Sequence, residues 1–185
     1  MKIIGIDQSI NSTGICVRQD SKTRYYIVHA DSSLSKKARQ FFEDHPKSWF
    51  KHLYYPKQQP VKTSSYSDKE QAKAFNISAI GNLIEQIIKK EKPDLVQLEG
   101  VSYSSNGNVV DLAGLNYVIR YILTRHQIPF KVISPSELKK RATGNGSAEK
   151  AEMIYVWLAC DPKMREFESC KIDDVADAYF LTLTE

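Results

Sequence analysis

The hydrophobic pattern of the first 30 residues predicts three short β-strands. Each run is rich in β-branched and aromatic residues, and turn-forming residues separate it from the next run. The runs cover residues 2–6, 14–18 and 24–30. Because the connections between them are short, we expect the three strands to form an antiparallel meander.

Beyond residue 66 the apolar positions recur with a helical period. Ser67 and Glu70 have the spacing of a capping box, which predicts the first turn of a long helix, and Pro93 follows its expected end. One apolar stripe runs along this predicted helix and consists of Ile77, Ile80, Ile84, Ile87 and Ile88.

The rest of the chain alternates between strand and helix patterns. Strands are predicted at residues 94–99 and 130–133, and helices at residues 111–125, from 135 onward, at about 148–159 and at 173–182. Ser134 is the expected cap of the helix that begins at Pro135, and Glu137 completes its capping box. Three strands followed by alternating helices and strands are typical of an α/β fold with a mixed five-stranded sheet flanked by helices.

The segment between residues 31 and 66 shows no regular period, and we interpret it as a basic insertion after the third strand. Its basic residues are Lys36, Lys37, Arg39, Lys47, Lys51, Lys57 and Lys62, and its aromatic residues include Phe41, Phe42, Trp49, Phe50, Tyr54 and Tyr55. Basic residues interleaved with aromatics can follow a nucleic-acid backbone and stack on bases. The same aromatics can instead form the core of a small folded subdomain.

Length and composition indicate one soluble globular domain over residues 1–185. Of the 185 residues, 42% are hydrophobic and 26% are charged, which excludes a disordered tail, a membrane span and a large multidomain machine. The formal net charge is +4. Seven of the 26 basic and three of the 22 acidic residues lie between residues 31 and 65, so the remainder carries 19 of each and the insertion holds the whole excess.

The cysteines and the N-terminus favour a reducing compartment. Cys16, Cys160 and Cys170 form no C-x-x-C pair and have no histidine at zinc-ligand spacing, so we expect neither a disulfide framework nor a structural zinc site. Asp7 interrupts the first apolar run before a signal-peptide core is complete, and no run approaches the ~20 apolar residues of a spanning helix. We therefore expect a cytoplasmic protein without a membrane partner.

Two carboxylates stand at the ends of predicted strands. Asp7 ends the first strand and Glu99 ends the strand at 94–99, where a charged side chain after a buried run is costly unless it is paired, coordinated or solvated. Taken alone, Asp7 is more typical of a turn-forming aspartate that bonds to its own loop.

A second group of acids opens the last predicted helix. Asp174 and Asp177 are three residues apart and share a helical face, and Asp173 and Asp177, four apart, can share one as well. Acids in a first turn also complement the helix dipole, which accounts for Asp173 and Asp174 better than for Asp177. Carboxylates that converge from strand ends and a helix suit a hard, oxygen-seeking ion such as Mg²⁺ or Mn²⁺.

Four motifs stand out along the chain: Ile4-Gly5-Ile6-Asp7-Gln8-Ser9 with Thr13-Gly14, Leu98-Glu99-Gly100-Val101, the segment from Leu138 to Lys150 that contains Gly144-Asn145-Gly146-Ser147-Ala148-Glu149-Lys150, and Asp174-Val175-Ala176-Asp177-Ala178. In these motifs and in their order, the chain resembles the RuvC-type Holliday junction resolvases of the RNase H-like (retroviral integrase) superfamily. The resemblance implies an RNase H-like fold.

The resemblance places the family's four catalytic acids on Asp7, Glu99, Asp174 and Asp177. Its Asp-x-x-Asp spacing selects Asp174 over Asp173, a choice that helix geometry leaves open. These acids are expected to hold two Mg²⁺ or Mn²⁺ ions per site, which fits the two-metal mechanism of phosphodiester hydrolysis.

The resemblance also places DNA-contacting lysines on Lys139 and Lys150. The loop at 143–146 leads into a helix expected to begin near Ser147, so free backbone N–H groups can face a phosphate with Lys150 one turn into the helix. The alternative is a flexible loop with ordinary surface lysines. Lys140, Lys36, Lys37 and Lys51 are further candidates for contact with DNA.

The chain departs from the family pattern in two places. The family has an aromatic residue three positions after the strand glutamate, where it stacks on a base at the junction centre, but Ser102 stands there and Tyr103 follows. Tyr103 can take over that role through a shifted loop, or it can be a packing residue. The insertion at 31–66 is also longer than the family's usual connection between the third strand and the first long helix. We therefore expect a bacteriophage-type member of the family.

These observations predict a Mg²⁺-dependent, structure-selective endodeoxyribonuclease that resolves Holliday junctions and other branched DNA, leaving 5′-phosphate and 3′-hydroxyl ends. A nearly two-fold junction favours a homodimer, for which the resemblance offers the helix at 111–125 as the contact face. Its apolar residues Leu112, Leu115, Ile119, Ile122 and Leu123 are equally explained by packing on the sheet. The alternatives are a branched-DNA-binding module of the same fold and, more remotely, an actin-like ATPase.

Overall fold

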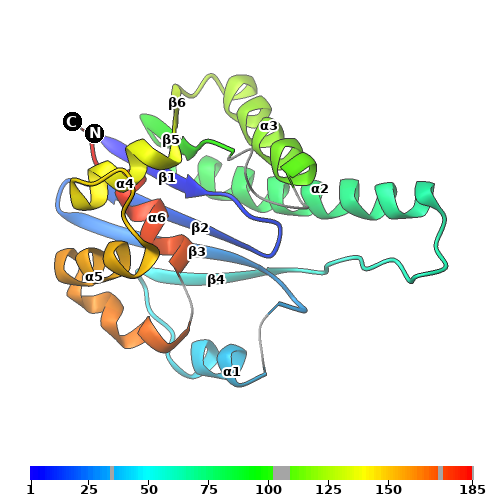
Figure 1. Cartoon of the computed structure of the whole chain (residues 1–185), viewed down its shortest axis with the longest axis horizontal. Coiled ribbons are helices and arrows are strands. Elements are labelled where there is room, and N and C mark those ends of the chain that lie inside the picture. Colours follow the sequence, from blue (N-terminus) through cyan, green and yellow to red (C-terminus); the bar gives the residue numbers. More distant parts are fainter. Residues whose placement is uncertain (34–35, 102–108, 171–172, 185) are drawn as a thin grey trace.

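The computed structural model describes residues 1–33, 36–101, 109–170 and 173–184, and its centre is a six-stranded mixed sheet (Figure 1). The strands, in the sheet order β4-β3-β2-β1-β5-β6, are β4 (Phe50–Tyr55), β3 (Lys22–Ala30), β2 (Ser12–Gln19), β1 (Lys2–Asp7), β5 (Leu95–Glu99) and β6 (Phe130–Ile133). β1, β2 and β3 form the predicted antiparallel meander, and β5 and β6 continue the sheet parallel to β1.

Helices cover both faces of the sheet, as the sequence predicts for an α/β fold. The helices are α1 (Lys36–Asp44), α2 (Tyr66–Glu91), α3 (Val109–Arg125), α4 (Pro135–Thr143), α5 (Lys150–Cys160) and α6 (Asp173–Leu181), with a 3₁₀ segment at Pro162–Cys170. One apolar core joins the sheet to α2 and α3, and the other joins its opposite face to α1, α4, α5 and α6. Within the described residues, no helix is long and apolar enough to cross a bilayer.

The predicted five strands are corrected to six because the insertion supplies β4. This strand pairs in parallel with β3, and α1 makes the crossover that a parallel pair requires. β4 is an edge strand whose three middle residues, His52 to Tyr54, are all half-buried, so it lacks the alternation that identifies a strand in the sequence. The insertion is therefore part of the sheet.

The aromatic residues of the insertion pack into the protein. Phe42 and Phe50 are buried and stack with each other and with Phe167, while Phe41 and Trp49 pack against the same core. These rings therefore serve packing, as the alternative holds, but the core that they join is that of the main sheet and not of a separate subdomain. Buried rings are not free to stack on bases.

The long helix α2 begins earlier than the sequence pattern predicts. Ser65 is its cap: the Ser65 hydroxyl accepts from the Asp68 backbone N–H at 3.1 Å, and the Asp68 carboxylate accepts from the Ser65 backbone N–H at 3.1 Å. The expected pair Ser67 and Glu70 has the same spacing but lies inside the helix. Two overlapping capping-box patterns compete here, and the one whose two bonds both form sets the boundary.

Helix α6 lies unusually close to the sheet. A Cβ atom added to Gly5 would stand 2.1 Å from the backbone oxygen of Ala178, and one added to Gly14 would stand 2.1 Å from that of Asp174. Neighbouring positions on β1 and β2 are therefore glycines because a helix backbone occupies the space of their side chains. This contact sets the height of the N-terminal half of α6 above the strand ends.

We predict that Gly14→Ala destabilises the protein by about 3 kcal/mol, because the new methyl group must displace the backbone of α6. Chemical denaturation measures the free energy of unfolding.

Gly114→Ala is the matched control. The added Cβ would meet the flexible end of Ile77 at 3.3 Å, and alanine favours a helix by up to about 1 kcal/mol over glycine. We expect unchanged or slightly greater stability. Equal losses in the two variants would contradict the proposed role of the contact with α6.

Candidate metal centre

Asp7 and Glu99 lie side by side because their strands are parallel neighbours that end at the same edge of the sheet. β1 pairs with β5 in a register that sets Ile6 opposite Leu98, so the next residue of each strand carries a carboxylate. Asp7 is 8% exposed and Glu99 is half-buried. The sequence pattern thus places both predicted acids correctly at strand ends.

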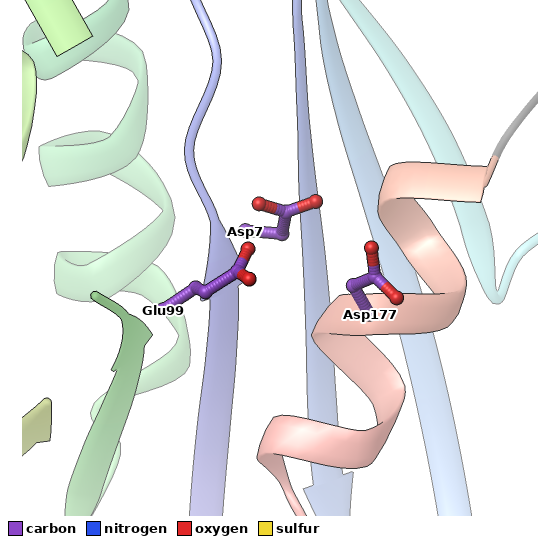
Figure 2. A group of neighbouring side chains, drawn as sticks. All are labelled: Asp7, Glu99 and Asp177. Carbon is purple, nitrogen blue, oxygen red and sulfur yellow. The ribbon is translucent and has the colours of Figure 1, made fainter. Parts of the chain in front are cut away.

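Helix α6 brings Asp177 to the same place. Figure 2 shows the carboxylates of Asp7, Glu99 and Asp177 pointing toward one another, two from the sheet and one from the helix that crosses it. One ligand atom from each of the three lies within 4.8 Å of the other two. A single ion placed among them can therefore contact all three side chains.

Asp174 lies one turn before Asp177 on α6 and completes the predicted set of four. It is outside the closest group of three, but its charge is one of the causes that raise the pKa of Asp7. Asp173, the alternative that the helix pattern left open, instead lies 3.0 Å from the Nζ atom of Lys150.

The electrostatics of the group favour a bound cation. Burial, followed by the charges of Glu99, Asp174 and Asp177, raises the pKa of Asp7 well above its usual range. Burial is also the main cause that raises the pKa of Glu99 and Asp177, and it raises that of Asp174 to about 6. Like charges that are held close together with little solvent make each other's ionised form costly, and a divalent cation removes that cost.

The residues fit a hard divalent metal ion. Asp177 is 9% exposed, and its Oδ1 atom is buried without a hydrogen-bond partner among the described residues. A buried carboxylate oxygen without a donor is unfavourable unless something else coordinates it. The donor set consists of carboxylate oxygens alone, which suits Mg²⁺ or Mn²⁺ and not a thiolate- or imidazole-seeking ion.

Two of the predicted lysines border this group. The Nζ atom of Lys150 lies 3.3 Å from Asp177, and the charge of Lys139 acts on both Glu99 and Asp177. Burial disfavours the charged form of Lys150, but the charge of Asp177 and the contact with Asp173 outweigh it and raise the pKa of Lys150. The ammonium group of Lys150 therefore remains charged beside the acids.

The local structure around Lys150 differs from the prediction. α5 begins at Lys150 with Glu149 as its cap residue, so Lys150 occupies the first position and not the second turn. Residues 143–146 end α4 instead, and Gly144 adopts a positive φ of 80° as its C-terminal cap. The glycine-rich segment thus serves first to stop a helix, a role that the motif alone does not reveal.

The other DNA-binding candidates are more scattered. Lys140 is exposed on α4, Lys36 is exposed on α1, and Lys51 lies on the edge strand β4, which β3 and β2 separate from β1. Lys51 is a neighbour of Lys90, whose pKa is lowered by burial and by the charge of Lys51. Tyr103 and the side chain of Lys37 lie outside the described residues.

Two amide side chains that the sequence analysis does not single out support the position of Glu99. Gln8 Nε2 and Asn116 Nδ2 both donate to the backbone oxygen of Glu99, at 2.9 and 3.1 Å, and both residues are buried. Asn116 interrupts the apolar face of α3, and a polar residue at a buried helical position is the signal that could identify it.

Comparison with known proteins agrees with the fold. A family model described as crossover junction endodeoxyribonuclease RuvC matches residues 58–185, which include Glu99, Asp174 and Asp177. Crossover junction endodeoxyribonuclease RuvC of Gloeobacter violaceus is 30% identical over 108 residues, 58% of this chain and 61% of that protein. The Brachyspira hyodysenteriae protein of the same name is 32% identical over 110 residues, 58% of this chain and 64% of its own. These matches span less than two thirds of either relative.

Solved structures extend the likeness of the fold to nearly the whole chain. Thermus thermophilus RuvC in complex with a Holliday junction substrate superposes with a TM-score of 0.62 at 17% identity, covering 98% of this chain and 90% of that one. The yeast mitochondrial Holliday junction resolvase Ydc2 gives a TM-score of 0.51 at 16% identity, covering 97% and 76%. Since the family model matches well over half of its residues, the chain belongs to the RuvC family of crossover junction endodeoxyribonucleases.

Proposed function

We propose that this protein is a metal-dependent, structure-selective endodeoxyribonuclease that cuts four-way DNA junctions. The observation that carries this proposal is the convergence of Asp7, Glu99 and Asp177, with one buried Asp177 oxygen left without a hydrogen-bond partner among the described residues. Membership of the RuvC family and the names of the matched relatives support the same activity and the same branched substrate.

In the proposed mechanism, Asp7, Glu99, Asp174 and Asp177 would hold two Mg²⁺ or Mn²⁺ ions. Bound there, the ions would activate a water molecule as the nucleophile and stabilise the negative charge that develops at the phosphate. Strands β1 and β5 fix Asp7 and Glu99 from one side, and α6 fixes the other two acids from across the sheet edge. Attack of the water oxygen on phosphorus breaks the P–O3′ bond, and the departing oxygen takes up a proton, which yields 5′-phosphate and 3′-hydroxyl ends.

Lys150 and Lys139 have the charge and position to receive the scissile strand. Lys150 now shares its ammonium group between Asp173 and Asp177, at 3.0 and 3.3 Å. If Asp177 held a cation, less negative charge would hold Lys150, and its ammonium group could contact a phosphate. Lys139 approaches the same acids from α4 and can contact a neighbouring phosphate.

The protein is proposed to act as a homodimer through the outer face of α3. The apolar residues that the sequence pattern identifies on this helix do not form that outer face. Leu115, Ile119, Ile122 and Leu123 are instead buried in the core of the same chain. On the same helix Val110, Tyr117 and Tyr121 remain 83%, 66% and 63% exposed. Exposed aromatics on one helix mark an interaction surface, and a two-fold pair would match the symmetry of the junction.

We expect Asp7→Asn and Glu99→Gln to abolish cleavage of a labelled four-way junction in Mg²⁺ or Mn²⁺ while leaving junction binding intact, because each change removes a charged ligand but preserves shape. Cleavage gels and gel-shift titrations at fixed salt measure the two properties, and linear duplex DNA tests structure selectivity.

Asp20→Asn is the control, since Asp20 is an exposed acid in the turn between β2 and β3, at the opposite end of the sheet. Full cleavage by either site variant would overturn the metal-centre proposal. A wild-type protein that binds junctions but leaves them uncut in both metals would be a binding module instead.

A second expectation concerns pH in the absence of metal. The pKa of Asp174 is raised from 3.8 to about 6, so between these values the folded state keeps a proton that the unfolded state has released. The contribution of Asp174 to the free energy of unfolding therefore falls as pH rises through this window, by about 3 kcal/mol. Thermal unfolding in EDTA should show a steeper decline for the wild type than for Asp174→Asn.

Addition of Mg²⁺ or Mn²⁺ above pH 6 should recover the lost stability in the wild type, because a ligand that binds the folded state shifts the unfolding equilibrium. Asp7→Asn should gain much less. Identical pH profiles for the wild type and Asp174→Asn would show that this carboxyl is not destabilised by burial.

The dimer proposal predicts that Tyr117→Glu combined with Tyr121→Glu lowers the mass in solution, because two buried charges per protomer would oppose association. Sedimentation velocity measures the change. Tyr155→Glu, at a 76% exposed tyrosine of α5, is the control and should leave the mass unchanged. A dimer that survives the double substitution would place the interface elsewhere.

A further inference from the structure

A cavity of about 350 Å³ lies between the β1–β2 turn, the first turns of α2 and the connection from β4 to α2. Its lining includes Ile10 and Asn11, which follow closely after Asp7 in the chain, so it opens at the same end of the sheet as the acids. Figure 1 shows α2 extending past the sheet at this end, with the connection from β4 running alongside to its first turn. Its outer wall includes Lys57, which lies before the part of the chain that the family model matches.

The connection that forms the outer wall is held firmly in place. The buried side chain of Asn76 bonds to Gln58 on both sides, accepting from its backbone N–H at 2.9 Å and donating to its backbone oxygen at 3.0 Å. The Lys57 backbone N–H donates to Asp31 Oδ1 at 3.1 Å, and Gln59 Nε2 donates to Ser32 Oγ at 2.9 Å. The cavity is therefore a preformed feature of the fold.

The charges of the lining are unbalanced. Three lysines, Lys57, Lys69 and Lys73, face the cavity with one acid, Asp111. Lys73 pairs with Glu70 at 2.9 Å and with Asp111 at 3.4 Å. Within the described parts of the chain, Lys57 and Lys69 have no acidic partner, and Lys57 Nζ contacts the neutral amide of Asn11 at 2.6 Å.

The charged groups of the lining suit a phosphate. The amide oxygen and nitrogen of Asn76 already bond to the backbone of Gln58, so this side chain serves first to hold the wall of the cavity. Two half-buried lysines without acidic partners offer point charges, the usual contacts of a sugar-phosphate backbone. The apolar floor of Ile10, Ala72 and Ile77 can accept the face of a sugar.

We propose that this cavity binds the sugar-phosphate backbone of a DNA strand as it leaves the metal centre, through Lys57 and Lys69. The inference rests on the proposed nuclease function, because a strand cut at the acids must cross the neighbouring surface. It also assigns a function to part of the positive charge of the insertion. Lys57 would contact DNA at the cavity, whereas Lys51 lies on β4, three strands from β1.

The test is the double variant Lys57→Gln, Lys69→Gln. We measure its binding to a four-way junction and to single-stranded DNA, in EDTA, over a series of salt concentrations. Two lost phosphate contacts should lower the affinity by at least about tenfold near 0.1 M salt and reduce the slope of log K against log salt by about 1.5–2. The loss should not depend on DNA sequence.

The matched control is Lys22→Gln, Lys92→Gln, which removes the same charge at the opposite end of the sheet. Thermal unfolding verifies that both double variants are folded. Equal affinity and slope in the two double variants would overturn the inference, since the effect would then come from net charge alone.

The two proposals can fail separately. If the wild type cuts junctions and the Lys57, Lys69 variant binds DNA like the wild type, the cavity proposal is wrong and the nuclease proposal stands. If no branched DNA is cut in Mg²⁺ or Mn²⁺ but this variant loses affinity and salt slope, the cavity proposal stands and the nuclease proposal is wrong. A wild type that binds no DNA would overturn both.

Discussion

The close contact between α6 and the β1–β2 pair is the constraint on which the site depends. The backbone of α6 occupies the space that side chains at Gly5 and Gly14 would fill, and this sets the height of Asp177 above the strand ends. Packed interiors are stiff, so a displaced helix would shift as a unit and separate its acids from Asp7 and Glu99. The geometry of a charged site is thus set by an uncharged contact.

Bringing the four acids together raises the free energy of the folded state, and the packing of the two apolar cores offsets this effect. Four acids whose pKa values are all raised oppose folding at neutral pH until a cation joins them. The sheet is covered by apolar helix packing on both faces, and the strand ends that carry Asp7 and Glu99 emerge between the two layers. The buried faces of the strands therefore supply stability, and the ends of the same strands carry the acids of the site.

The insertion between residues 31 and 66 combines two roles that its composition could not separate. Its rings at Phe42 and Phe50 belong to the core and hold the added strand β4, whereas the lysines whose side chains are described are exposed or half-buried, with Lys57 at the cavity. A deletion of the whole segment would remove a strand together with the charge. Single lysine substitutions separate the electrostatic contribution from the structural one.

The sequence by itself determined the meander and the alternating helices and strands, because period and capping are local properties, and it put Asp7 and Glu99 at strand ends. It could not decide between overlapping caps at Ser65 and Ser67, find the edge strand β4, or place the start of α5 at Lys150. Only the tertiary structure decided which acids meet, that Gln8 and Asn116 support Glu99, and that Lys57 and Lys69 face one cavity. Each of these contacts is between residues that are far apart in the chain. The packing of α6, α3 and α2 on the sheet brings those residues together.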